Sequence, residues 1–287
     1  MTVQVLRTPG EFGGLRLGSW GLVPTMGALH AGHLTLISRA AAENETTVVS
    51  IFVNPTQFGS ANDLSRYPRD LETDIARAAS AGADIIYAPE ASTVYPPGFS
   101  TWVEPGSLAD RWEGESRPGH FRGVATVVTI LLDSVKPDRS YFGQKDFQQL
   151  QIIRRMHSDL RLPGEVIASP TVRDMDGLAL SSRNARLSTG ARLTARKIPK
   201  ALEAMVTAAA VGVRQSTELE EIGRQTLSCT DVRIDYLAVV DDATLEPVTF
   251  SSDNSRVLLA VEVDGVRLID NVALPSAMGH ISGTSSA

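Results

Sequence analysis

Short β-rich runs alternate with helical patterns through the first 172 residues, and this alternation limits the possible folds more than any other feature of the chain. The candidate strands are residues 21–25, 47–54, 83–89, 139–143 and 165–172, and the helical patterns cover roughly 31–43, 70–81, 123–135 and 146–159. Alternation of this kind predicts a parallel sheet with helices on both faces. In such a doubly wound sheet, ligands bind beyond the carboxyl ends of the strands.

The pattern changes after residue 172. Residues 191–210 are Ala-rich and look helical, and residues 231–241 and 255–274 look like strands. The second of these runs contains Asp264-Gly265, a strong hairpin signal. We therefore predict a smaller α+β domain over residues 173–275, followed by a disordered tail at 276–287.

Composition narrows the classes of function. The chain has 287 residues and a net charge of −6, which argues against a nucleic-acid or anionic-membrane partner. Its most apolar stretch, residues 124–135, is too short to cross a bilayer, and its first residues lack a signal-peptide pattern. Cys229 is the single cysteine, so we expect a core residue in a reducing cytoplasm, without disulfides or thiolate metal clusters.

Two histidines three residues apart follow the first candidate strand, in PTMGALHAGHL at residues 24–34. Small residues form a turn before a helix that begins near His30, and the free N–H groups of a helix N-terminus favour an anion. His30 and His33 share one side of the first helical turn, and Gly32 lets a ligand approach the backbone. We predict a polyphosphate site. Ordinary surface or core histidines and a zinc pair are the alternatives, and zinc is disfavoured because no HExxH or nearby third ligand is present.

Two further stretches place polar residues at the ends of strands. In FVNPTQF, residues 52–58, the amides of Asn54 and Gln57 suit a ligand with hydroxyl and carboxylate groups, although Asn-Pro alone also marks a turn. In YFGQKDFQQL, residues 141–150, Lys145 opposes the helix dipole, which indicates an anionic ligand. Asp146 is either a helix N-cap or an acceptor for ribose hydroxyls.

A fourth stretch, LALSSRN at residues 178–184, follows the last strand of the first domain. Its two adjacent hydroxyls and its arginine form a candidate phosphate site, and the alternative is a serine N-cap beside a solvated arginine. The Gly/Pro-rich segment 117–123 is either part of a ligand site or a basic surface loop. Its charged or titratable side chains are Arg117, His120 and Arg122.

Together these stretches resemble the pantoate–β-alanine ligase family of the nucleotidyltransferase superfamily. The motifs PTMGALHxGH, FVNPxQF, FGxKDxQQL and SSRN occur in the family's order and spacing, and the resemblance extends to about residue 274. HxGH alone indicates only the superfamily, whereas the four motifs together indicate this family. The resemblance implies a Rossmann-like, HIGH-type doubly wound sheet over residues 1–172 that binds ATP and pantoate, with the smaller domain covering the site.

The resemblance also implies a reaction. The family condenses (R)-pantoate with β-alanine at the expense of ATP, through a pantoyl-adenylate intermediate, and releases AMP and pyrophosphate. We therefore expect ATP as a substrate, Mg²⁺ as a cofactor, a homodimer, and a cytoplasmic enzyme without nucleic-acid or membrane partners.

Roles can be carried over residue by residue. The expected catalytic residues are His33, His30, Lys145 and Arg183. The expected ATP-binding residues are Met26, Gly27, Ala28, Leu29, His30, Ala31, Gly32, His33, Gly143, Gln144, Lys145, Asp146, Val172, Leu180, Ser181, Ser182 and Arg183. The expected pantoate-binding residues are Gln57 and Gln149, and the expected β-alanine-binding residues are Gln57, Asn54 and His120. Asp74 is the expected protein contact of Mg²⁺.

Three positions depart from the family's usual pattern. Gln144 replaces Glu and Leu180 replaces Met, and we expect both changes to be tolerated. Thr73 precedes Asp74 where an acidic pair is common, which leaves one carboxylate near the expected metal. Two other functions stay open: a transferase that releases an adenylylated product, and a nucleotide sensor without turnover. Gln57, Gln149 and the second domain argue against the transferase.

Overall fold

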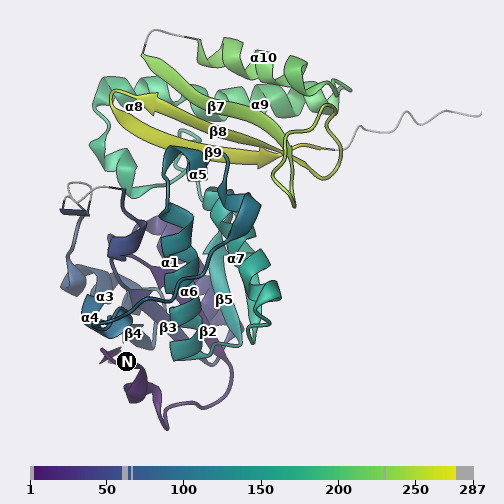
Figure 1. The fold of residues 1–287 in the computed structure, drawn as a ribbon. Helices are drawn as coiled ribbons and strands as arrows, with labels where there is room; N and C mark the ends of the chain where they lie inside the picture. The colour runs from purple at the N-terminus through teal and green to yellow at the C-terminus, as the bar shows by residue number, and fades with distance from the viewer. Residues whose placement is uncertain (1–2, 60–63, 66, 229–230, 276–287) are drawn as a thin grey trace, which may run out of the picture. The chain divides into compact units, whose positions relative to one another are not determined.

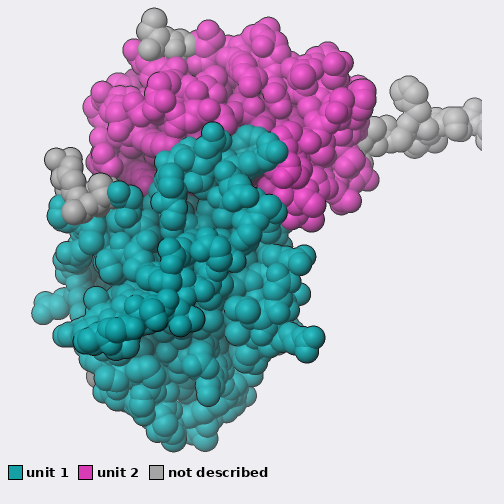
Figure 2. Space-filling view, viewed as in Figure 1, with its two compact units in different colours: residues 1–173, 180–182 teal, residues 174–179, 183–287 magenta. Residues whose placement is uncertain are grey.

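The computed structural model describes residues 3–59, 64–65, 67–228 and 231–275. These residues divide into two compact units, which Figure 2 colours separately. The first unit contains the described residues up to Arg173 together with Leu180–Ser182. The second contains Asp174–Ala179 and the described residues from Arg183 onward. Cys229 and the tail predicted to be disordered, residues 276–287, lie outside the described residues.

The first unit is built on a six-stranded sheet, counted over the described residues, in which neighbouring strands are parallel (Figure 1). The strands are β1 (Gln4–Leu6), β2 (Trp20–Thr25), β3 (Thr46–Ile51), β4 (Ile85–Tyr87), β5 (Arg139–Gly143) and β6 (Glu165–Ser169). Their spatial order is β1-β4-β3-β2-β5-β6. The chain runs outward from β2 in one direction through β3 and β4 and in the other through β5 and β6. The carboxyl ends of β2 and β5 therefore flank the point where a doubly wound sheet binds ligands.

Helices pack against the sheet of the first unit. Those that contact its strands are α1 (Ala31–Glu43), α3 (Leu71–Ser80), α6 (His120–Val135) and α7 (Phe147–Asp159), and the short helices α4 (Ala91–Val94) and α5 (Glu113–Ser116) lie between α3 and α6 along the chain. Helices α1 and α3 contribute Ile37 and Ala78 to a buried cluster that includes Val23 and Val49 of the strands. Helices α6 and α7 contact each other and strands β2, β5 and β6. Leu22, which alternates with Val23 along β2, is fully buried as well, so both faces of the sheet are covered.

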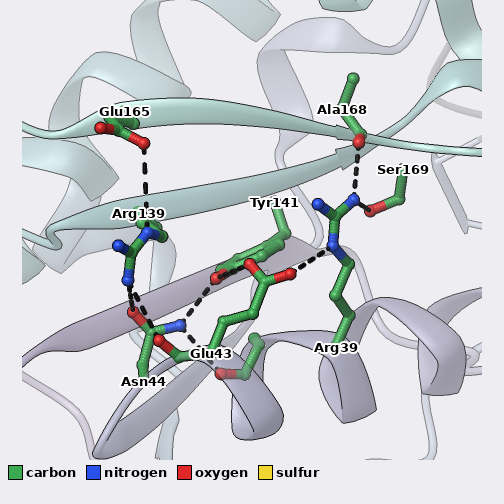
Figure 3. A network of polar contacts seen from close by, with 9 residues as sticks. Arg39, Glu43, Asn44, Arg139, Tyr141, Glu165, Ala168 and Ser169 are labelled. Atoms are coloured by element: carbon green, nitrogen blue, oxygen red, sulfur yellow. Dashed lines mark hydrogen bonds and ion pairs between the residues drawn. The ribbon is translucent and has the colours of Figure 1, made fainter.

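The C-terminal part of helix α1 is fixed to the sheet by a polar network (Figure 3). Arg39 donates to the carbonyl of Ala168, near the end of β6, at 2.8 Å. About one turn further on, at the C-cap of the helix, the Asn44 amide donates to the hydroxyl of Tyr141 on β5 at 2.7 Å, and that hydroxyl donates to Glu43 at 2.8 Å. Because α1 carries the two histidines in its first turn, these contacts fix the direction in which their side chains project.

The second unit has a three-stranded antiparallel sheet, counted over the described residues, with helices packed on it. Its elements are α8 (Thr189–Ala195), α9 (Lys197–Ala210), α10 (Ser216–Leu227), β7 (Val232–Asp241), β8 (Ser255–Val263) and β9 (Val266–Ala273). The predicted hairpin joins β8 to β9, and Asp264 and Gly265 have φ values of 50° and 70°, as a tight type I′ turn requires. Apolar residues of the three helices and three strands form one core.

The predicted α/β architecture with a smaller α+β part is confirmed, and the differences are local. The predicted strands 47–54 and 165–172 end earlier, because the chain turns near Pro55 and Pro170, which cannot donate to a strand ladder. The predicted helix 191–210 is two helices, α8 and α9. Strand β1 and helix α10 carried no clear sequence signal. None of the described helices is both long and apolar enough to span a bilayer.

Candidate active site

Two side chains from helix α3 hold the turn between β2 and α1. Asp74 is only 3% exposed, and its two oxygens accept the backbone N–H groups of Ala28 and Leu29, each at 2.8 Å. Arg77 donates to the carbonyl of Leu29 at 2.5 Å. Ala28 and Gly27 have left-handed φ values of 50° and 80°. A Cβ atom on Gly27 would lie 2.7 Å from an Asp74 oxygen, so this packing requires glycine.

These contacts bear on two expected roles. The N–H groups of Ala28 and Leu29 are already bonded, so any contact of these residues with ATP would use other atoms. Asp74 fits poorly as a metal ligand, because both of its oxygens are engaged by the backbone, and its assignment to Mg²⁺ finds no support in these contacts. Within the described residues, no group of three or more His, Cys, Asp or Glu side chains is placed to hold a metal ion.

The two histidines cap the helix that they begin. His30 is the N-cap of α1, and its Nδ1 accepts the N–H of Gly32 at 3.2 Å. Nδ1 of His33 accepts the N–H of His30 at 3.3 Å, and the two ring centroids are 4.1 Å apart. This arrangement is a capping box made from imidazoles. Because each Nδ1 accepts a hydrogen bond, each neutral ring carries its proton on Nε2, on the side away from the backbone.

Both rings are neutral near pH 7. Burial, with a smaller contribution from His30, lowers the pKa of His33 to about 3. Burial also lowers the pKa of His30, helped by the positive charge of Lys145. The charges of Lys145 and Asp146 act on both imidazoles, so the ends of β2 and β5 lie close together. The site thus combines uncharged N–H donors with the positive charge of Lys145.

The residues after β5 form a short 3-10 turn, Gln144–Asp146, that leads into α7. Lys145 and Asp146 form an ion pair at 3.6 Å. Asp146 is the N-cap residue of α7, as one of the two alternatives predicted, although its side chain makes no capping hydrogen bond, and its role as an acceptor for ribose hydroxyls stays a prediction. Gln149 lies in the first turn of the same helix. The expected roles of Gly143, Gln144 and Gln149 stay predictions.

Gln57 lies at the centre of a second group of contacts, after β3. Its amide Nε2 lies 3.0 Å from the sulfur of Met26, and its Oε1 accepts from Asn54 at 2.9 Å. The backbone carbonyl of Gln57 accepts from Nδ1 of His120 at 2.8 Å, while Nε2 of His120 lies 3.1 Å from an Arg117 guanidinium nitrogen. Asn54 and His120, two of the three expected β-alanine ligands, therefore hold the third, Gln57, and direct contact of any of them with β-alanine stays a prediction.

His120 opens helix α6, three residues before the predicted start, after Gly119 with a left-handed φ of 79°. Burial, followed by the charge of Arg117, lowers the pKa of His120 to about 4, so this ring is neutral as well. Arg122 lies over the ring of Trp102 at 4.5 Å and pairs with Glu104 at 3.4 Å. Of the two arginines in the segment 117–123, Arg117 therefore lies against His120, and Arg122 lies over the ring of Trp102.

Residues that follow β6 also lie near the predicted site. The N–H of Leu180 donates to the carbonyl of Val172 at 2.9 Å. A Cβ atom added to Gly32 would lie 3.9 Å from the side chain of Leu180. Leu180 therefore lies beside the turn between β2 and α1, residues 26–30, which we call the histidine turn. Ser181 and Ser182 follow in the first unit, whereas Arg183 belongs to the second, and its place at the site stays a prediction. Within the first unit, the ends of β2, β3, β5 and β6 thus bring the predicted motifs together.

Three residues that shape the site were missed by sequence reasoning: Arg77, Tyr95 and Gly123. Tyr95 donates to Asn54 at 2.8 Å. A Cβ atom on Gly123 would lie 2.6 Å from the carbonyl oxygen of Thr56, so α6 approaches the turn after β3 as closely as glycine allows. Only Gly123 carried a usable signal, since a glycine inside an apolar helical pattern often marks a close backbone approach. Arg77 and Tyr95 contact residues that are distant in the sequence, and no local pattern predicts such contacts.

The parallel sheet, its switch point beside β2, and the paired imidazoles at a helix N-terminus define a Rossmann-like α/β protein of the nucleotidyltransferase type. Comparison with known proteins is more specific. The family model of pantoate-beta-alanine ligase matches residues 7–273. A pantothenate synthetase from Rhizorhabdus wittichii is 49% identical over 256 residues, which cover 89% of this chain and 91% of that protein.

Solved structures agree with this match. The pantothenate synthetase of Thermus thermophilus is 46% identical, with a TM-score of 0.90 over 95% of this chain and 100% of that one. The pantoate-beta-alanine ligase of Francisella tularensis, solved in complex with beta-gamma ATP and beta-alanine, is 36% identical, with a TM-score of 0.78 over 95% of this chain and 98% of that one. The chain therefore belongs to the pantoate–β-alanine ligase family and is an enzyme of that family.

Proposed function

We propose that this enzyme joins (R)-pantoate to β-alanine in two steps that consume ATP. In the first step, a carboxylate oxygen of pantoate attacks the α-phosphorus, the bond to pyrophosphate breaks, and pantoyl adenylate forms. In the second step, the amine of β-alanine attacks the acyl carbon, the bond to AMP breaks, and the amine loses a proton. The products are pantothenate, AMP and pyrophosphate.

The main support for this proposal is that the predicted motifs follow the carboxyl ends of β2, β3, β5 and β6 and lie close together. His30 and His33, with ring centroids 4.1 Å apart, each direct an Nε2–H group away from the backbone, and the charge of Lys145 reaches both rings. Adenylyl transfer depends on alignment and charge stabilisation more than on a covalent nucleophile. Fixed neutral donors beside a cation suit the charge that develops on the phosphate oxygens. We assign His33 as the principal catalytic residue and His30 and Lys145 as its partners.

The hydroxy acid would bind next to this group. Gln57 is 8% exposed and its Nε2 lies 3.0 Å from Met26, which itself belongs to the histidine turn. A carboxylate or hydroxyl held by Gln57, and by Gln149 from α7, would therefore lie beside the expected position of the phosphates. β-Alanine would approach from the side of Asn54 and His120. Arg183 would complete the phosphate contacts.

Three further parts of the proposal come from the family resemblance. Magnesium would be held mainly by the phosphates of ATP, since both oxygens of Asp74 are engaged by backbone N–H groups. The enzyme would be a homodimer, which sedimentation at several protein concentrations can test. It would act in the cytoplasm.

Exchange of labelled pyrophosphate into ATP tests the proposal. Exchange that requires pantoate, and does not require β-alanine, is expected because the first step is reversible and independent of the amine. AMP should accumulate only when pantoate and β-alanine are both present. ATP binding without exchange would instead identify a nucleotide sensor, and a stable adenylylated product would identify a transferase.

A further inference from the structure

The hydroxyl of Tyr95 begins a chain of hydrogen bonds that ends at Gln57. Tyr95 follows α4, and its hydroxyl lies 2.8 Å from Oδ1 of Asn54 and 3.2 Å from the hydroxyl of Thr56. Asn54 is 1% exposed, so its amide has no access to bulk water and depends on these partners. No role follows for Tyr95 from the motifs or from the expected ligand contacts.

Backbone groups fix which way the Asn54 amide faces. Its Nδ2 lies 3.2 Å from the carbonyl oxygen of Gly123, which can only accept, and its Oδ1 lies 3.4 Å from the N–H of Thr56, which can only donate. The opposite orientation of the amide would set donor against donor and acceptor against acceptor. The Tyr95 hydroxyl must therefore donate to Oδ1, and it adds the closest of the hydrogen bonds that this oxygen accepts.

The orientation of Asn54 sets that of Gln57. Nδ2 of Asn54 donates to Oε1 of Gln57 at 2.9 Å, so the acceptor oxygen of Gln57 is occupied and its NH₂ group faces Met26. A thioether sulfur accepts hydrogen bonds weakly, so a ligand oxygen can readily replace it. Gln57 therefore presents donors, which match a carboxylate or hydroxyl oxygen of a hydroxy acid.

We propose that Tyr95 is a positioning residue for the hydroxy-acid substrate, because its hydroxyl holds Asn54, and Asn54 holds the Gln57 amide with its NH₂ group toward the ligand. This inference rests on the proposed function of Gln57 in binding pantoate. Without the Tyr95 hydroxyl, Oδ1 of Asn54 loses its closest donor and keeps the Thr56 hydroxyl at 2.9 Å and the longer Thr56 N–H contact. Asn54 is then held less firmly and Gln57 samples more than one orientation, which reduces affinity for the substrate oxygen.

Replacing the hydroxyl alone is feasible at this position. The Tyr95 ring packs against Phe52, Phe99 and Trp102, with centroid distances of 6.4, 5.0 and 6.1 Å. Tyr95→Phe keeps these ring contacts and removes only the donor. Tyr87→Phe is the control, because Tyr87 is a buried tyrosine whose hydroxyl bonds Ser134 and whose ring packs on Phe12, at 5.1 Å between centroids, outside the contacts that join Asn54 and Gln57.

The test is pyrophosphate exchange with pantoate and ATP varied in turn. Tyr95→Phe should raise the KM for pantoate about threefold to tenfold, the loss expected for one neutral hydrogen bond, and leave the KM for ATP unchanged. Tyr87→Phe should leave both values unchanged. An unchanged pantoate KM in Tyr95→Phe, or equal rises for both substrates, would overturn the inference. Absence of pantoate-dependent exchange in the unmodified enzyme would be a different result and would refute the proposed function itself.

A double-mutant cycle tests whether Tyr95 acts through Gln57. In a Gln57→Ala background, Tyr95→Phe should change the kcat/KM of exchange for pantoate, measured with pantoate well below its KM, by less than about twofold, because the group it positions is gone. The same threefold to tenfold loss in that background would show that the hydroxyl acts elsewhere, and the inference would then be wrong.

Discussion

Replacing Asp74 by Asn tests how the histidine turn is held. The carboxylate accepts two backbone N–H groups at 2.8 Å and is 3% exposed. An Asn side chain can accept only one of them, and its NH₂ group would face the other N–H. One charge-assisted hydrogen bond is lost and one buried donor stays unsatisfied, which together should cost about 3–5 kcal/mol of stability in the first unit. The exchange rate should fall as well, because the turn orients both histidines.

Urea unfolding, monitored by tryptophan fluorescence, measures the loss of stability of the first unit in Asp74→Asn. The three tryptophans, Trp20, Trp102 and Trp112, all belong to the first unit. Asp70→Asn is the matched control, because Asp70 is the exposed N-cap of the same helix and Asn caps nearly as well as Asp, at a cost below about 0.5 kcal/mol. Equal stability of the two variants would refute the reasoning. A raised Mg²⁺ requirement without loss of stability would instead identify Asp74 as a metal contact.

Three further predictions concern the same unit. His33→Ala should reduce pyrophosphate exchange roughly a hundredfold or more, the usual effect of losing one donor to transition-state charge, while the protein stays folded. Gly123→Ala should destabilise the first unit by about 1–3 kcal/mol and raise the KM for pantoate, because the new Cβ meets backbone atoms, with the carbonyl oxygen of Thr56 at 2.6 Å. Because burial lowers the pKa of His33 from 6.5 to about 3, the unfolded chain binds the extra proton between these values. The free energy of unfolding should therefore fall as pH drops from 6.5 toward 3, and it should fall less in His33→Ala.

Each of these predictions has its own control or contrary result. His157→Ala, on α7 with its ring near the carbonyl of Pro163, should leave exchange unchanged, so an equal loss there would remove the special role of His33. Gly10→Ala, in the same unit and with nothing within 4 Å of the added Cβ, should be close to neutral, and a Gly123→Ala protein as stable as that variant would contradict the packing argument. If the free energy of unfolding has the same pH dependence in the unmodified enzyme and in His33→Ala, the His33 ring is not the buried neutral group described above.

Much of the fold was predictable because its signals are local. The alternation of strands and helices, the bounds of α1 at 31–43 and the hairpin at Asp264-Gly265 all follow from short-range patterns, and the structure agrees. The convergence of the motifs followed from one general rule about the carboxyl ends of parallel strands. Strand β1 was missed because its three residues are too few for periodicity to show.

The supporting contacts could not be predicted, because they join residues that are distant in sequence. The family resemblance implied that Asp74 contacts Mg²⁺, and the structure shows its two oxygens bonded to the turn before α1. Asn54 and His120 are expected to contact a ligand, which stays a prediction, and the structure adds that their hydrogen bonds hold Gln57. Composition indicates which residue types are available at a site, but only the folded backbone shows which of them face a ligand and which hold their neighbours.

A structure of the enzyme with pantoate and a non-hydrolysable ATP analogue tests the central claim most directly. Nε2 of His30 and of His33 should lie within hydrogen-bond distance, about 2.7–3.2 Å, of phosphate oxygens, with the pantoate carboxylate beside the α-phosphorus and the NH₂ group of Gln57 on a pantoate oxygen. Imidazoles that contact only protein atoms, with the nucleotide bound elsewhere, would contradict it.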